Sequence, residues 1–413
     1  MKIHDIIIVG AGPAGIMAAL SASESKKDIL LLEKNDQIGK KILITGKGRC
    51  NLTSTASLDI FIEKFGKQGL FLRSAFSLFF NEDLMSFFQE RGLGLKVERQ
   101  GRVFPKTDRA DSIVRVLSDS LKKNGVKILY NSTLDQIIKK EDHLQLDITG
   151  GDSLFAKKVI LALGGSSFKA TGSAGDGFRI VKKLGHSVTP LLPGLVPLRT
   201  KERWVGELQG LSLKNIRIVF KYGKKKITSE VGELIFTHFG VSGPLVLDLS
   251  NKVMRILKED KKKIDLLIDL KPGLSDEQLS NKMLSVFKEK SGSQIKNILK
   301  DMLPQRLIPT FICLTGIDPA KKANQISKSE RSKLAALLKN LPLTIVGSLG
   351  LERAMVTSGG INTKEIDPRA MESRLVSGLY FAGEIIDGAA SSGGYNLQQA
   401  FSTGYLAGIS ATK

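Results

Sequence analysis

The chain has 413 residues, 42% of them hydrophobic and 25% charged, and these proportions exclude collagen-like, low-complexity and largely disordered proteins. Its 62 Lys and Arg outnumber its 41 Asp and Glu, which gives a formal net charge of +21. The length predicts two or three domains. Cys50 and Cys313 are the only cysteines, and no Cys and His have zinc spacing, so we expect neither a disulfide framework nor a metal site.

The apolar stretch from Ile6 to Leu20 resembles a secretory signal, but Gly10, Gly12 and Gly15 interrupt it. No segment approaches the roughly 18 uninterrupted apolar residues that a membrane-spanning helix requires. We therefore expect a cytoplasmic protein that makes no membrane contact.

Residues 5–9 (DIIIV) predict a buried strand, which is followed directly by a GxGxxG loop and by a helix-like segment, IMAALSAS. In such a loop Gly10 permits a tight turn, Gly12 lets the backbone approach a pyrophosphate, and Gly15 lets the helix pack on the strand. The phosphates then bind free N–H groups at the helix N-terminus. This segment predicts a dinucleotide site, for either FAD or NAD.

A second buried strand is predicted over residues 28–32, and it ends at Glu33, 18 residues after Gly15. A carboxylate at this strand tip can accept hydrogen bonds from both ribose hydroxyls of an adenosine, and it would repel a 2′-phosphate. The spacing therefore strengthens the prediction of a dinucleotide site.

The middle of the chain has a different pattern. Residues 188–198 contain three prolines and predict a crossover into an inserted region. Residues 213–223 and 263–273 then carry strand patterns, and the second ends in a Pro-Gly stop. Ser275–Gln278 and Ser327–Glu330 both fit the capping box that begins a helix, so helices follow the strands.

Strand and glycine patterns return from Leu343, and residues 377–408 predict a buried strand, a glycine-rich loop and a helix that starts near Asn396. FAD is long, so its ribityl and isoalloxazine parts need a second site beyond the first glycine loop. A strand that ends at Gly383 and Glu384 before a helix N-terminus suits this half, because the positive helix end favours the anionic reduced flavin. The C-terminal segment therefore favours FAD.

The GxGxxG loop occurs once in the chain, and the second candidate, TGSAGDG at residues 171–177, has the wrong spacing. A separate nicotinamide-binding domain is therefore not expected. If NADH or NADPH is the reductant, it reaches the flavin transiently or binds in a cleft without a sequence motif.

Together these patterns predict an α/β fold class with three parts. A Rossmann-like FAD-binding domain is built from both chain ends, residues 1–190 and 342–413. An inserted β-rich domain over residues 191–272 carries a small helical subdomain over residues 273–341.

Four separated segments resemble, in order, the BaiN/RdsA-type flavoproteins, a family of bacterial FAD-dependent oxidoreductases. They are GKKILITGKGRCNLT (39–53), TGSAGDGFRIVKKLGH (171–186), THFGVSGP (237–244) and VTSGGINTKEIDPRAMESRLVSGLYFAGEIID (356–387). The resemblance runs nearly from end to end and implies redox chemistry at a flavin. One branch of this family is linked to the reduction of uridine in ribosomal RNA, and another reduces steroid-like double bonds.

Two positions depart from the family pattern. Leu163 stands where such flavoproteins usually carry Thr before paired glycines, and Ala389 stands where family members tend to place a second acidic residue. The loop beside the flavin therefore differs in its hydrogen-bonding groups, which leaves the substrate more open than the cofactor.

The resemblance also implies a set of residues that contact FAD. For the adenosine half they are Gly10, Gly12, Pro13, Ala14, Gly15, Glu33, Lys34 and, through its backbone, Leu134. The loop beside the flavin would add Lys41, Gly46, Gly48, Arg49 and Asn51, and the later segments Gly164, Gly383, Glu384, Asp387, Gly394, Asn396 and Leu397. Arg49 would offset pyrophosphate charge and Asn51 would hydrogen-bond the cofactor, and the alternative for both is a self-capped surface turn.

The excess positive charge is concentrated in the inserted region. Residues 201–340 carry 27 Lys and Arg against 15 Asp and Glu. The clusters are Lys224–Lys226, Lys261–Lys263, Lys321 with Lys322, and Arg331 with Lys333. They are typical either of a surface that neutralises the phosphates of RNA or of a solvated face in a lysine-rich protein. The resemblance slightly favours ribosomal RNA as a partner.

Reduction of a double bond by a flavin needs a proton donor besides the hydride, and the chain offers few candidates. Cys50 lies in the predicted flavin loop and is either an acid or a small packing residue. His238 lies in a glycine-rich turn and is either a substrate contact or a simple turn histidine. Tyr395, beside the expected helix start, either orients the substrate or packs.

We therefore expect an FAD-dependent oxidoreductase that reduces a carbon–carbon double bond with electrons from NADH or NADPH. Uridine in ribosomal RNA is the favoured substrate, and a small apolar, steroid-like enone is the second. The contrasting hypothesis is a flavin oxidase of a small amine, or a protein that holds FAD without catalysis.

Overall fold

The computed structural model describes residues 2–260 and 263–413. It divides into two compact units: Met1–Gly194 together with Leu351–Lys413, and Leu195–Gly350. Lys261 and Lys262, which belong to one of the lysine clusters of the sequence, lie outside the described residues.

The first unit is built on a seven-stranded sheet in the order β6-β2-β1-β9-β8-β7, with β19 also paired to β9. Its parallel strands are β1 (Ile3–Val9), β2 (Ile29–Leu32), β6 (Lys127–Leu129), β9 (Leu154–Leu161) and β19 (Leu379–Phe381). The strands β7 (Leu134–Lys139) and β8 (Leu144–Ile148) add an antiparallel hairpin. The carboxyl ends of four parallel strands, β1, β2, β9 and β19, therefore meet at one edge of the sheet.

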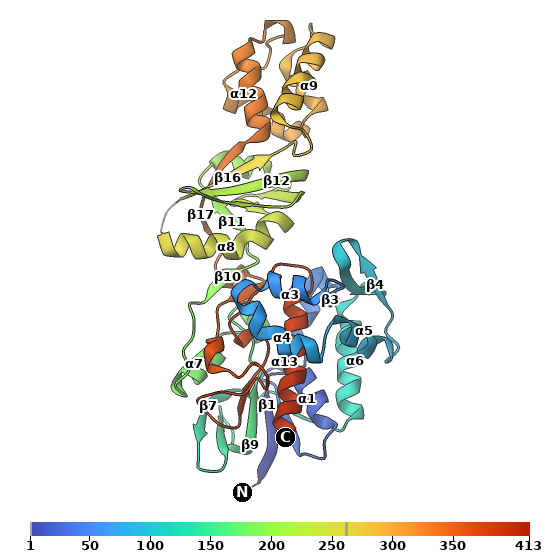
Figure 1. The fold of residues 1–413 in the computed structure, drawn as a ribbon, viewed down its shortest axis with the longest axis vertical. Coiled ribbons are helices and arrows are strands. Elements are labelled where there is room, and N and C mark those ends of the chain that lie inside the picture. The colour runs from blue at the N-terminus through green and yellow to red at the C-terminus, as the bar shows by residue number, and fades with distance from the viewer. Residues whose placement is uncertain (1, 261–262) are drawn as a thin grey trace. The chain divides into compact units, whose positions relative to one another are not determined.

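Two helices from opposite ends of the chain lie side by side in this unit, α1 (Pro13–Ser23) and α13 (Tyr395–Thr412) (Figure 1). Their backbones approach closely, because a Cβ atom added at Gly404 would lie 2.2 Å from the Ala14 carbonyl oxygen. A Cβ at Gly408 would likewise lie 2.4 Å from the Ala18 oxygen. The predicted α/β fold with a Rossmann-like domain built from both chain ends is confirmed.

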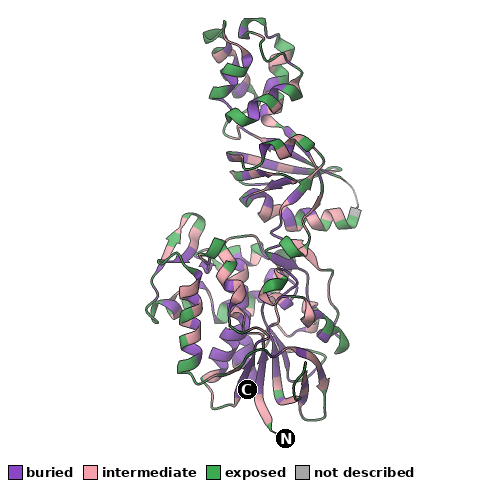
Figure 2. Cartoon of the chain, turned by 180° about the vertical axis from the view of Figure 1, so that it is seen from behind, coloured by how far each residue is buried: buried purple, intermediate pink, exposed green. Residues whose placement is uncertain are grey.

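The remaining elements of the first unit cover and border the sheet. The helices are α2 (Lys40–Ile44), α3 (Leu58–Lys64), α4 (Gly69–Leu78), α5 (Asn81–Gln89), α6 (Ala110–Lys123) and α7 (Asp176–Lys183). Two small sheets pair β3 (Thr53–Ser54) and β4 (Leu95–Glu98) with β5 (Arg102–Pro105), and β10 (Leu192–Gly194) with β18 (Val356–Ser358). The second halves of β1 and β9, residues 6–9 and 159–161, are buried in the interior of this unit (Figure 2).

The second unit contains an antiparallel sheet that closes on itself. Its strands are β11 (Leu198–Thr200), β12 (Ser212–Tyr222), β13 (Lys225–Thr228), β14 (Gly232–Thr237), β15 (Gly240–Ser242), β16 (Ile264–Asp269) and β17 (Leu341–Ser348). Because β12 pairs with both β14 and β16, the order β12-β14-β15-β11-β17-β16 forms a closed ring. Alternate side chains such as Ile218 and Phe220 are fully buried inside it.

Helices complete the second unit: α8 (Pro244–Asp260) after β15, and α9 (Asp276–Glu289), α10 (Ile295–Ile298), α11 (Ile308–Thr315) and α12 (Lys328–Lys339) between β16 and β17. Figure 1 shows α9 and α12 beyond one end of the ring of strands and α8 on the opposite side. Both predicted capping boxes are confirmed, since Ser275 Oγ accepts a hydrogen bond from Gln278 N at 3.1 Å and Ser327 Oγ accepts one from Glu330 N at 3.2 Å. The helices and the ring share one hydrophobic core.

Strand β17 differs from the expected domain limits, in which residue 342 begins the return to the FAD-binding domain. In the structure β17 pairs with β16 and β11, and the first unit resumes at Leu351. The physical reason is the alternation of Leu341, Leu343 and Ile345, all fully or almost fully buried, which supplies the last inward face of the ring.

A buried histidine joins the end of α7 to the segment before β19. His186 Nδ1 lies 3.1 Å from Glu365 Oε2, and its Nε2 lies 2.9 Å from Ser373 Oγ. Ser373 Oγ already accepts the N–H groups of Leu375 and Val376, so its proton points to His186 and the ring is neutral. Burial lowers the pKa of His186.

This arrangement predicts a pH-dependent stability. A lowered pKa in the folded state means that the unfolded chain takes up the proton first, so stability is lost as the pH falls below the ordinary histidine pKa of about 6.5. We expect His186→Gln, measured by thermal unfolding between about pH 7 and pH 5, to lose less stability over this range than the unsubstituted protein. The exposed His238→Gln is the control and should keep the full slope. Identical slopes for all three proteins would contradict the assignment.

Candidate functional site

A pocket lies at the edge of the first unit's sheet where β1, β2, β9 and β19 end. Thirteen residues expected at the cofactor line it: Gly10, Gly12, Pro13, Ala14, Glu33, Lys34, Lys41, Leu134, Gly164, Gly383, Glu384, Asn396 and Leu397. These residues come from segments up to about 390 positions apart in the sequence. The fold therefore assembles one continuous site from both chain ends.

The glycine loop is packed tightly on its sheet side and open on its pocket side. Gly10 has φ of 101°, and a Cβ there would lie 2.5 Å from the Ala162 oxygen. A Cβ at Gly15 would lie 1.8 Å from the Gly10 oxygen, so the helix can approach the strand only without a side chain. A Cβ at Gly12, the N-cap of α1, would meet nothing within 4 Å. The N-terminal end of α1 thus borders open space in the pocket, where an anion fits.

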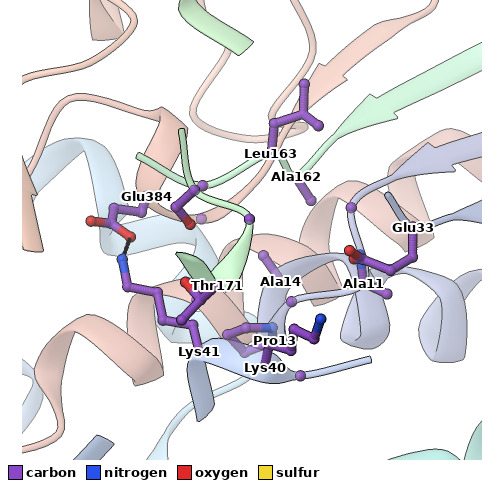
Figure 3. Close-up of a pocket in the computed structure, with 18 of the residues that line it drawn as sticks. Ala11, Pro13, Ala14, Glu33, Lys40, Lys41, Ala162, Leu163, Thr171 and Glu384 are labelled. Atoms are coloured by element: carbon purple, nitrogen blue, oxygen red, sulfur yellow. Dashed lines mark hydrogen bonds and ion pairs between the residues drawn. The ribbon is translucent and has the colours of Figure 1, made fainter. Parts of the chain in front are cut away.

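Glu33 is held at the tip of β2 by donors on both of its oxygens. Its Oε2 accepts the Ala11 N–H at 2.7 Å, and its Oε1 accepts the backbone N–H and side-chain amide of Asn35 at 2.9 and 2.6 Å. The side chain is only 7% exposed and lines the pocket (Figure 3). The carboxylate is therefore fixed in position, and its remaining lone pairs can accept ribose hydroxyls.

Residues 171–176, a segment that we call the strap, border the same end of the pocket as Glu33. Lys34 Nζ lies 2.9 Å from Asp176 Oδ2, and Asn35 Nδ2 donates to the Thr171 oxygen at 3.3 Å. Thr171, Gly172, Ser173 and Asp176 all line the pocket. These four residues were not predicted to contact the cofactor, although their glycine-rich TGSAGDG segment was the available signal in the sequence.

At the other end of the pocket, Glu384 and Lys41 form an ion pair of 2.6 Å (Figure 3). Glu384 Oε1 also accepts the Thr357 N–H at 2.7 Å and the Ser167 hydroxyl at 3.0 Å. Lys41 Nζ donates to Ser167 Oγ at 2.8 Å. Four segments that are distant in the sequence therefore meet in one polar network.

The start of α13 adds polar groups to this end. The Asn396 side chain accepts the Ala390 N–H at 2.9 Å and donates to the Ala390 oxygen at 3.2 Å, which ties the glycine-rich loop to the helix. Gln399 lines the pocket, is 2% exposed, and its Nε2 has no hydrogen-bond partner among the described residues. Buried amides without partners are rare, so this donor indicates that a ligand with an acceptor belongs here.

These features fit FAD. The open Gly12 cradle suits a pyrophosphate, the anchored Glu33 suits a ribose, and the Gln399 amide and the α13 N-terminus suit the polar flavin edge. When bound, FAD supplies two-electron transfer as a hydride. The residues of this chain bind and orient it and hold the surrounding charges.

Several expected cofactor residues do not line the pocket: Gly15, Gly46, Gly48, Arg49, Asn51, Asp387 and Gly394. Arg49 pairs with Glu98 and, through its Nε at 2.8 Å, with Asp108. The neighbouring groups fix the orientation of the Asn51 amide. In this orientation its nitrogen donates to the oxygens of Val103 and Thr53, and its oxygen accepts the Gly394 N–H at 3.0 Å. Both side chains therefore brace the loop before β3, and a direct role at the cofactor stays a prediction.

The three candidate catalytic residues lie in different surroundings. Cys50 is fully buried outside the pocket lining, and burial raises the pKa of its thiol to about 12. Tyr395 is 8% exposed and packs edge-on against Phe61, with ring centroids 4.7 Å apart. His238 is exposed in the turn between β14 and β15 of the second unit. Their catalytic roles stay predictions.

Within residues 2–260 and 263–413, no helix is long and apolar enough to cross a membrane, and no group of three or more His, Cys, Asp or Glu could hold a metal ion. The family described as the HI0933-like protein Rossmann domain matches residues 4–410. The chain belongs to this family. The predicted resemblance is thereby confirmed, and the protein is an FAD-dependent oxidoreductase.

Relatives with two different names match this chain over almost its whole length. It is 32% identical over 408 residues to the 3-dehydro-bile acid delta(4,6)-reductase of Clostridium scindens, covering 98% of both chains. It is also 32% identical over 414 residues to the ribosomal RNA dihydrouridine synthase of Haemophilus influenzae, again covering 98% of both. Among solved structures, an open flavocytochrome c3 fumarate reductase is similar in fold, with a TM-score of 0.53, 17% identity, and coverage of 100% of this chain and 78% of the other.

The anchored carboxylate gives a first prediction for this site. Glu33→Ala should weaken FAD binding by about 1 to 3 kcal/mol, because the ribose hydroxyls and the Ala11 N–H lose their acceptor. Titration of the FAD-free protein by isothermal calorimetry measures this loss, and the thermal melt of the same sample shows whether the fold persists. An unchanged dissociation constant in a folded variant would mean that Glu33 stabilises the protein and does not contribute to FAD binding.

The strap gives a second prediction. The Lys34–Asp176 pair is partly exposed, so Asp176→Asn should accelerate FAD dissociation only about two- to fivefold. The exchanged pair Lys34→Asp with Asp176→Lys should recover most of this loss, while Lys34→Asp alone should not. The return of flavin fluorescence after dilution measures the rate. Equal rates in all four proteins would show that the strap does not retain the cofactor.

Proposed function

We propose that this protein reduces a carbon–carbon double bond, with FAD held in the pocket of the first unit and NADH or NADPH as the source of electrons. The proposal rests on one combined observation. The pocket residues fit FAD, and two relatives that match almost the whole chain have names that denote reduction of a ring double bond. In the reaction NAD(P)H is oxidised to NAD(P)⁺. One alkene carbon receives a hydride and the other a proton, so the π bond is replaced by two C–H bonds.

Uridine in ribosomal RNA is the substrate we favour. The two relatives are equally similar in identity, so they do not decide between RNA and a steroid-like enone. The charge supports RNA: the chain has a net charge of +21, and Lys224, Lys225 and Lys226 are exposed at the turn between β12 and β13. A small steroid-like acid carries a single carboxylate and would gain little from such a surface, whereas a polyanion would gain much.

For the proton donor, His238 is the candidate to test first. A thiol with a pKa of about 12 is a weak acid near neutral pH, which argues against Cys50. The Tyr395 ring is packed in an aromatic cluster, which argues for a structural role. Histidine is the side chain that most often transfers protons in catalysis, and His238 is the exposed residue among the three candidates.

The test of catalysis is direct. We expect anaerobic NADH or NADPH to bleach the flavin absorbance, and subsequent addition of unmodified ribosomal RNA to restore it while uridine gains two hydrogens by mass spectrometry. Restoration by a steroid enone and not by RNA would replace the favoured substrate with the second. If neither nicotinamide bleaches the flavin, or neither acceptor reoxidises it, the proposed reaction is wrong.

The RNA branch has its own test. Lys225→Ala with Lys226→Ala should weaken RNA binding several-fold and reduce its salt dependence, because two phosphate contacts are lost. Lys122→Ala with Lys123→Ala, which removes the same charge from the end of α6, is the matched control. Filter binding at several salt concentrations measures both, and equal losses would assign the binding to net charge alone.

A further inference from the structure

A second hollow lies in the first unit, at a place where strand β9 changes its partner. Along one edge β9 pairs with β8 through Leu154–Ala156 and then with β19 through Val159–Leu161. Lys157 and Lys158 lie between these two pairings. The resulting break in the sheet opens a hollow of about 580 Å³, within the range of small-molecule sites.

This hollow is separate from the FAD pocket, and the two share no lining residue. The FAD pocket lies where β9 and β19 end, whereas the hollow lies where β19 begins, beside Ser377 and Gly378. The turn between β7 and β8, the loop around Arg369 and the end of α13 complete its wall. Neither the cofactor nor the proposed substrate accounts for it.

Most of the cations that line the hollow form no ion pair within the described residues. Within the described residues, Lys139, Lys140, Lys158 and Arg369 make no ion pair, and only Lys157 is paired, with Asp5 at 2.9 Å. These side chains come from three separate segments around the hollow. Their convergence leaves a strong positive potential in a concave space.

The acidic groups of the wall are mostly engaged. Asp142 lies 2.6 Å from His143 Nδ1, and Glu372 accepts the Gly378 N–H at 2.9 Å and lies beside the Tyr380 hydroxyl. Burial, helped by Glu372, raises the pKa of Tyr380 to about 12, so its phenol adds no charge. Glu141 is exposed at the rim. The lining holds five lysines and one arginine against Glu141, Asp142 and Glu372, so the balance of charge in the hollow is positive.

We propose that this hollow is a binding site for a small phosphate-bearing anion, distinct from the FAD pocket. Lys and Arg donors around a concave space match the several acceptor oxygens of a phosphate group. The volume admits a diphosphate or a phosphate attached to an organic group. Such a ligand would tie the β7–β8 turn, β9 and the Arg369 loop together and so stabilise the first unit.

The experiment is calorimetric titration of the FAD-loaded protein with pyrophosphate at low salt. We expect one site per chain, and we expect Lys158→Ala with Arg369→Ala to weaken binding by about tenfold or more, since hydrogen bonds to charged groups are lost. Lys122→Ala with Lys123→Ala, with the same change in net charge, should leave the affinity unchanged. Lys139→Ala with Lys140→Ala, both exposed where β7 ends, gives a second test if the first variant is unstable.

Three outcomes would overturn the site. The first is a titration without saturation, and the second is an equal loss in the control variant, which would assign the binding to the overall charge. The third is an oligoribonucleotide that displaces pyrophosphate and itself binds more weakly to the Lys158→Ala with Arg369→Ala variant, which would make the hollow part of a polymer surface. A nucleoside diphosphate and inorganic phosphate, titrated in parallel, distinguish whether the organic group contributes. FAD content, read from the flavin spectrum, shows that the cofactor site is intact in every sample.

Discussion

The close contact between α1 and α13 is the constraint on which the first unit depends. Gly404 and Gly408 remove the side chains that would collide with the α1 backbone, so the last helix of the chain can lie against the first. This contact brings the glycine loop and the start of α13 to the same edge of the sheet. Without it the two halves of an elongated cofactor would have no common site. The packing of the two chain ends against each other therefore also forms the cofactor site.

The inserted unit is subject to a different constraint, because exposed sheet edges can pair with other chains. The ring from β12 to β16 closes on itself, so each strand of the ring has a neighbour on both sides, and β13, which pairs with β12, is the edge that remains among the described strands. Its interior and the helices between β16 and β17 share one hydrophobic core. The unit can thus carry a large positive charge on its outer side chains without losing the apolar contacts that hold it together.

Local signals in the sequence were enough to predict the glycine loop, Glu33 and both capping boxes, because each depends on residues only a few positions apart or on one strand and its end. Contacts between distant segments were not predictable in this way. Lys41 with Glu384 and His186 with Glu365 and Ser373 join residues that only the folded sheet brings together. Arg49 shows the limit most clearly: its loop matched the family motif, yet its guanidinium pairs with Glu98 and Asp108. The motif located the loop but not the direction of the side chain.

The two ends of the same sheet differ in whether their positively charged side chains have acidic partners. Every lysine that lines the FAD pocket has an acidic partner: Lys34 with Asp176, Lys40 with Asp36 and Lys41 with Glu384. A pyrophosphate there must therefore be held chiefly by backbone N–H groups of the glycine loop and α1, which it can approach because Gly12 leaves open space beside the backbone. At the break beside β9, lysines and an arginine stand without partners, and no helix N-terminus is needed to attract an anion. At the carboxyl ends of the strands an anion is thus held by backbone N–H groups, and at the opposite ends it is held by charged side chains. The anion affinities of the two sites should therefore differ in their dependence on salt.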